Sequence, residues 1–97
     1  MAASFQRAVV EALTEHTMAA AKAKGCRVIT LAGGVSANGA LRKSFDEATQ
    51  KEGYDLYYPP LILCTDNAAM IGCAGYYLYE KQIFSDSTLN AVPNLKL

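Results

Sequence analysis

The chain has 97 residues, of which 52% are hydrophobic and 19% are charged. This composition excludes an intrinsically disordered chain and suits one small domain or a piece of a larger one. Nine basic residues balance nine acidic residues, so no net charge attracts nucleic acid or an acidic membrane surface.

The first half of the chain predicts a helix followed by a strand. Residues 2–24 contain neither Gly nor Pro, and their apolar side chains recur at steps of three and four, so we expect a helix that ends at Gly25. Residues 27–32 are β-branched and almost entirely apolar, which predicts a strand buried on both faces. Gly33 and Gly34 end that strand.

A second helix and a second strand follow. Ser36 or Asn38 can cap a helix that continues to Glu52, and Gly53 closes it. Residues 55–58 predict a strand, which the following pair of prolines ends because proline cannot donate to a β-ladder.

The last helix is predicted over residues 67–82, with Thr65 or Asp66 as its cap. Gly72 and Gly75 lie inside it, and we expect them to allow close packing against another element. Residues from 85 onward are rich in Ser, Asn and Pro and predict an irregular tail.

The predicted element order is α-β-α-β-α, and a strand–helix–strand unit predicts a parallel pair. Two parallel strands do not make a self-sufficient sheet, so the chain is expected to be part of a larger α/β structure. We therefore divide it into residues 1–84, part of an α/β lobe, and residues 85–97, a tail.

The cysteines and the hydropathy indicate the cellular compartment in which the protein is expected. Cys26, Cys64 and Cys73 have no paired spacing, so free, buried thiols in a reducing environment are expected. The apolar runs are shorter than the roughly 18 residues that a membrane helix needs, and no targeting signal is visible. A soluble, cytoplasmic chain without membrane contact is expected.

Two short strings carry most of the chemistry. Residues 31–38 (LAGGVSAN) place two glycines and the polar Asn38 between a strand and a helix, where backbone amides attract anions. Residues 64–70 (CTDNAAM) place Asp66 at a similar junction. Each string also has a plain structural interpretation, as an ordinary turn for the first and as a helix cap for the second.

The chain has too few suitable side chains to form a complete catalytic site. A catalytic metal needs about three protein ligands, and besides Asp66 only His16 and the cysteines are available. The pattern around His16 predicts a solvated surface position. No Gly-x-Ser-x-Gly elbow is present, and we assign no catalytic residue to this chain.

Taken together, the strings resemble one family closely. LAGGVSANxxLR (residues 31–42) and PPLxLCTDNAAMI (residues 59–71) are similar to the tRNA threonylcarbamoyladenosine-forming transferases, long described as O-sialoglycoprotein endopeptidases or glycoproteases. The opening AASFQ and the later AGYY also resemble that family. The similarity spans roughly residues 2 to 80.

The resemblance implies a fold of the actin, sugar-kinase and heat-shock-protein type, with this chain as part of its second ribonuclease-H-like lobe. It implies transfer of threonylcarbamoyl from its adenylate to the exocyclic amine of an adenosine beside the tRNA anticodon. Gly33, Gly34 and Asn38 are then expected at the adenylate (or ATP), and Asp66 at an iron or zinc ion. The implied partners are tRNA and accessory tRNA-modification proteins.

The chain also departs from the family pattern. A pair of histidines four residues apart, which supplies the family's other metal ligands, is missing, as are the first lobe and part of the second. We therefore expect a C-terminal fragment that is inactive alone and self-associates through its unpaired strand edges. Two alternatives stay open, namely a metal-dependent glycoprotease and a non-enzymatic interaction module.

Overall fold

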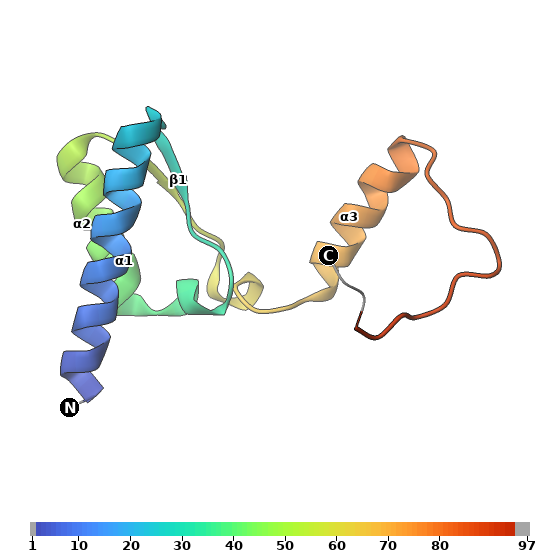
Figure 1. Cartoon of the computed structure of the whole chain (residues 1–97), viewed down its shortest axis with the longest axis horizontal. Helices are drawn as coiled ribbons and strands as arrows, with labels where there is room; N and C mark the ends of the chain where they lie inside the picture. Colours follow the sequence, from blue (N-terminus) through green and yellow to red (C-terminus); the bar gives the residue numbers. More distant parts are fainter. Residues whose placement is uncertain (1, 95–97) are drawn as a thin grey trace. The chain divides into compact units, whose positions relative to one another are not determined.

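The computed structural model describes residues 2–94 (Figure 1). It divides the chain into two compact units, of which the first ends at Asp66 and the second begins at Asn67. The first unit contains, in chain order, α1 (Ala2–Lys24), β1 (Val28–Thr30), the 3-10 turn η1 (Gly34–Ala37), α2 (Gly39–Glu52), β2 (Asp55–Tyr57) and the 3-10 turn η2 (Leu61–Leu63). The second contains α3 (Ala68–Glu80).

The two strands pair in parallel, with Val28 opposite Asp55 and Thr30 opposite Tyr57. Helix α2 makes the crossover between them and begins and ends as its sequence predicts. Asn38 caps its first turn, and Gly53 closes it in the left-handed conformation with φ 75°. The α/β class, the element order and the parallel pairing are therefore confirmed.

The core of the first unit lies between the helices and one face of the strands. Helices α1 and α2 lie side by side (Figure 1), and their facing side chains pack with the central residue of β1. The buried apolar residues of this cluster are Met18, Ala21, Ile29, Leu41 and Phe45.

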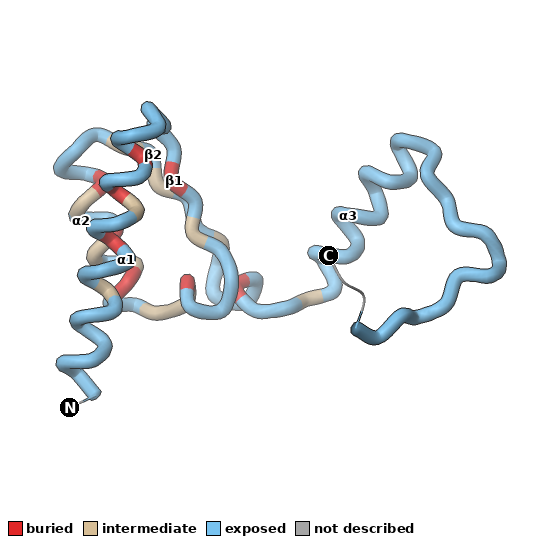
Figure 2. The backbone as a smooth tube through the Cα atoms, in the orientation of Figure 1, coloured by how far each residue is buried: buried red, intermediate tan, exposed pale blue. Residues whose placement is uncertain are grey.

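The prediction that β1 is buried on both faces is wrong for this chain. Only Ile29 is buried, while Val28 and Thr30 on either side of it are exposed (Figure 2). Within the first unit, helices cover one face of the two-stranded sheet and no described element covers the other. This strand therefore has more apolar side chains than the elements of the first unit bury.

Helix α3 starts slightly later than predicted and has a different cap. The side chain of Asn67, not that of Thr65 or Asp66, accepts a hydrogen bond from the amide of Ala69 at 3.1 Å. No residue of α3 is buried, and no atom lies within 4 Å of a Cβ built on Gly72 or Gly75, so the predicted close packing is not made among the described residues.

The remaining expectations have mixed outcomes. Residues 85–94 contain neither helix nor strand, and the last three residues of the expected tail lie outside the described residues. The cysteines are free, but only Cys64 is buried, whereas Cys26 and Cys73 are exposed. Among residues 2–94, no helix combines the length and the apolar character that spanning a membrane requires.

Candidate functional site

The glycine turn after β1 has a backbone that favours glycine. Gly33 adopts φ 83° and ψ 173°, a region that residues with a Cβ enter only with strain. Ser36 is buried and holds the turn closed, because its Oγ donates to the Gly33 carbonyl at 2.6 Å and its amide donates to the same oxygen at 3.0 Å. The conformation of the turn is therefore fixed by hydrogen bonds within the chain.

Asn38 connects this turn to α2. Its Oδ1 accepts a hydrogen bond from the Leu41 amide at 3.0 Å, so the cap uses the carbonyl oxygen of the side chain and not its Nδ2 donor group. The first turn of α2 contains no acidic side chain, so its positive dipole end is not neutralised locally. The start of α2 can therefore attract an anion.

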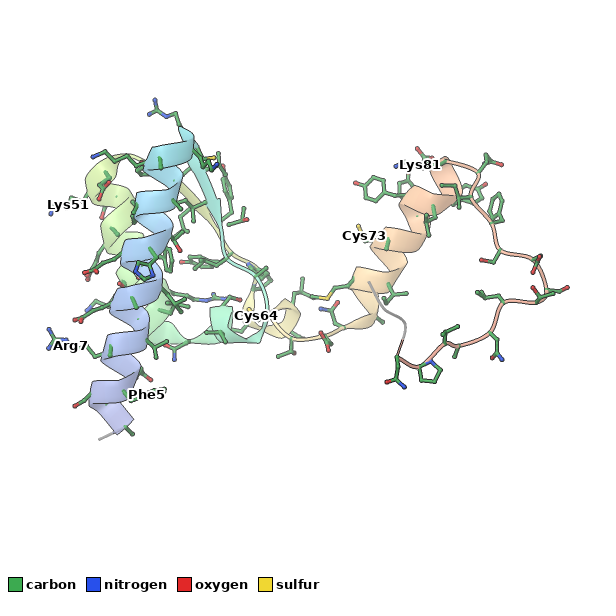
Figure 3. The ribbon with its side chains drawn as sticks, viewed as in Figure 1. Phe5, Arg7, Lys51, Cys64, Cys73 and Lys81 are labelled. Atoms are coloured by element: carbon green, nitrogen blue, oxygen red, sulfur yellow. The ribbon has the colours of Figure 1, made fainter. Side chains whose placement is uncertain are left out.

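The second string begins where β2 ends. Pro59 and Pro60 lead into η2, and Cys64 follows at the end of that turn (Figure 3). Cys64 is only 1% exposed. Asp66 follows in the irregular segment between η2 and α3 and is exposed. Its carboxylate is therefore accessible to solvent and to a ligand.

The structure brings the two strings together. The Leu31 amide donates to the Tyr57 carbonyl at 2.9 Å, so the segments leave β1 and β2 side by side at the carboxyl end of the sheet. Beyond that point, a Cβ built on Gly34 would lie 3.9 Å from Cγ2 of Thr65, an ordinary van der Waals distance. The glycine turn thus adjoins the residue that precedes Asp66.

Arg42 joins the same two segments through hydrogen bonds. Its Nε donates to the Ser36 carbonyl at 2.5 Å, and its Nη2 donates to the Pro59 carbonyl at 2.8 Å. The same Nη2 lies 3.0 Å from Cys64 Sγ, and the guanidinium stacks on the Tyr58 ring at 4.4 Å from its centroid. Sequence reasoning gave Arg42 no role, although it stands four residues after Asn38 and so shares its side of α2.

A largely apolar groove opens beside Asn38. It has a volume of about 300 Å³ and lies between the amino-terminal half of α1 and the start of α2. The residues that line it are Ala2, Phe5, Gln6, Val9, Val10, Leu13, Val35, Asn38 and Leu41. A flat, partly apolar ligand group could enter it beside the Asn38 amide.

The described residues do not by themselves fit a metal ion. Nowhere in residues 2–94 do three His, Cys, Asp or Glu side chains gather closely enough to bind one. His16 is exposed on α1, as the sequence predicted, and the Cys64 thiol is engaged by Arg42. Asp66 contributes one carboxylate, which is fewer than the three protein ligands of a catalytic centre.

Comparison with known proteins agrees with the sequence motifs. Residues 1–73 match the family model described as tRNA N6-adenosine threonylcarbamoyltransferase. Relatives of that name from Clostridioides difficile, Symbiobacterium thermophilum and Thermosipho africanus are 56%, 58% and 57% identical to this chain over all 97 residues. The chain spans only 28–29% of the length of these relatives.

Proposed function

This chain belongs to the tRNA N6-adenosine threonylcarbamoyltransferase family, and on that premise we propose that it is the C-terminal segment of such an enzyme. The family has an actin-like fold. The complete protein would move threonylcarbamoyl from its adenylate to the exocyclic amine of an adenosine beside the tRNA anticodon, in the cytoplasm. Accessory tRNA-modification proteins would assist it.

One observation carries the assignment of both strings to a single site. A Cβ built on Gly34 would lie at van der Waals distance from Thr65, although the two residues are far apart in the sequence. Ligands of open α/β sheets bind at the carboxyl ends of the strands, and both strings leave the sheet at that end. This supports a shared ligand for the glycine turn and the segment that carries Asp66.

The first string would bind the adenylate. Gly33 and Gly34 present backbone without side chains, so a ligand can approach closely, and the start of α2 favours its phosphate. The Asn38 Nδ2 group would donate to the nucleoside, and the groove beside it offers space for the base. These residues would hold and orient the adenylate while the tRNA amine approaches.

Asp66 would supply one ligand to an iron or zinc ion. Its exposure is compatible with that role, as is its place directly after Thr65, the residue that adjoins the glycine turn. The other ligands would come from outside the described residues, so the isolated chain is expected to be inactive, and we derive no chemical step through the ion.

A chimera tests the proposal. In the full-length Clostridioides difficile relative, the matching segment is replaced by this chain, to which it is 56% identical. The chimera is incubated with threonine, bicarbonate, ATP, unmodified tRNA and the relative's accessory proteins, and the nucleosides are analysed by mass spectrometry. Modified adenosine at the level of the parent supports the proposal.

A parallel incubation with a sialoglycoprotein tests the glycoprotease alternative. Nothing in residues 2–94 favours that alternative, since the chain has no His-Glu-x-x-His helix to supply a general base. Cleavage of the sialoglycoprotein without modified adenosine would overturn the proposed function.

A further inference from the structure

Arg42 hydrogen-bonds to both strings, to the Ser36 carbonyl in the first and to Cys64 Sγ in the second. It lies half-buried in the first turn and a half of α2. Through Nε it reaches the Ser36 carbonyl in the glycine turn, and through Nη2 the Pro59 carbonyl after β2. The planar fork of a guanidinium can make both bonds at once, which a lysine ammonium cannot do with the same geometry.

The surroundings of Arg42 keep this fork in place. The ring of Tyr58 lies under the guanidinium at 4.4 Å, and Tyr58 Oη in turn donates to the Asp46 carboxylate at 3.2 Å. On the opposite segment, Cys64 Sγ accepts from Arg42 and lies 3.6 Å from the Pro60 carbonyl. The fork is thus held by contacts with a ring, two carbonyls and a buried thiol.

We propose that Arg42 is a positioning residue that sets the distance between the glycine turn and the segment carrying Asp66. This inference rests on the proposed function, because it assumes that both strings face one ligand. Arg42 does not touch that ligand. It acts through Gly33 and Asn38 on one side and through η2 on the other, so its loss would let the two segments move apart.

The inference predicts two linked effects of removing the fork. The site would bind nucleotide less tightly, because the turn and its neighbouring segment no longer keep a fixed separation. Cys64, which is 1% exposed, would also become accessible to a thiol reagent, because the guanidinium that contacts its Sγ is gone.

The experiment compares Arg42→Gln and Arg42→Lys in the chimera with Lys43→Gln as the matched control. Lys43 is the next residue on α2, is exposed and makes only a 3.9 Å surface ion pair with Glu47. ATP affinity is measured by calorimetry. Iodoacetamide labelling of Cys64 is followed by peptide mass spectrometry well below the melting temperature, with Cys26 as the internal reference.

For Arg42→Gln we expect ATP affinity to fall about tenfold and Cys64 labelling to accelerate about tenfold, while Cys26 labelling stays unchanged. Arg42→Lys keeps the charge and one donor group, so it should restore part of both effects. Lys43→Gln should match the unmutated chimera. If both Arg42 variants melt earlier but bind ATP and shield Cys64 normally, Arg42 is merely structural and the inference fails.

The labelling also separates this inference from the proposed function. If the unmutated chimera neither binds ATP nor modifies tRNA, the proposed function fails, and Cys64 labelling still shows whether Arg42 holds the segments together. Should Arg42→Gln not fold, Arg42→Lys provides the same two measurements with a smaller perturbation. Normal Cys64 protection in that variant would then count against the inference.

Discussion

Asn38 and Leu41 form the contact that gives the candidate nucleotide residue its orientation. Oδ1 of Asn38 accepts a hydrogen bond from the Leu41 amide at 3.0 Å, and Leu41 is itself buried in the core. The helix cap and the amide proposed to bind the ligand thus belong to one side chain. A useful substitution must therefore remove the proposed ligand contact of Asn38 while keeping its helix cap.

Replacing Asn38 by Asp keeps the cap and removes the amide donor. Asp and Asn cap helices about equally, so the melting temperature of the chimera should stay close to that of the unmutated chimera. ATP affinity should fall about tenfold, because the carboxylate cannot donate and repels phosphate. Asn38→Ala should also lower stability by about 1 kcal/mol. Unchanged ATP binding by Asn38→Asp would leave this residue as a cap only.

Replacing Gly33 by Ala should strain the turn even though space is available for the methyl group. No atom lies within 4 Å of a Cβ built there, but φ 83° with ψ 173° costs a residue with a Cβ about 1–3 kcal/mol. The melting temperature and the ATP affinity of the chimera should both fall. Gly39→Ala is the matched control, since Gly39 is helical and its Cβ site is also open. Equal melting temperatures for the two variants would contradict the strain.

Replacing Asp66 by Asn tests the metal assignment. Neutralising the carboxylate should lower the iron or zinc content of the purified chimera about tenfold or more, with little change in fold, because Asp66 is exposed and does not cap α3. Metal content is measured by mass spectrometry of the ions. The control is Asp55→Asn, another exposed carboxylate in the same unit. If Asp66→Asn and Asp55→Asn contain equal amounts of metal, Asp66 is not a metal ligand.

The isolated 97-residue chain should self-associate. Among the described residues each strand pairs on one side only, and Val28 and Tyr57 are 52% and 61% exposed. Sedimentation velocity at rising concentration should show a dimer or a larger assembly. Val28→Lys should shift the distribution toward monomer, because charged side chains on edge strands oppose pairing. A compact monomer at every concentration would contradict this expectation.

The turn at Asp86 should depend on pH. The side-chain hydroxyl of Thr88 and then its amide donate to Asp86 Oδ1, and these bonds lower the pKa of that carboxyl. A lowered pKa means that the turn is fully stabilised above the ordinary carboxyl pKa and loses that stabilisation as pH falls through the lowered value. An NMR titration of the chain should show this, and Thr88→Ala should move the pKa upward. An identical titration in the two proteins would refute the hydroxyl contact.

Local signals in the sequence were sufficient for the elements of the first unit. The bounds of α1 and α2 follow from glycines and from a capping Asn, and the parallel pairing follows from the strand–helix–strand order. These features depend on residues close together in the chain. The proximity of the two strings follows in turn from that pairing.

Features that depend on distant contacts were not predicted. Asn67 caps α3 in place of Asp66, and both residue types are equally good caps, so only the backbone conformation decides between them. The contacts of Arg42 could not be predicted without knowing that Pro59 and Cys64 lie beside α2. The burial of β1 was overestimated because its apolar residues exceed the cover that the described helices provide.

The β1–α2–β2 crossover also has a consequence for the order of folding. Pairing of β1 with β2 closes only the loop that contains α2. Contacts between segments that are near each other in the chain form fastest. Residues Gly34 and Thr65 are brought together by this same closure. The distance between the two strings would then be set early in folding. More distant parts of a longer chain would dock later and more slowly.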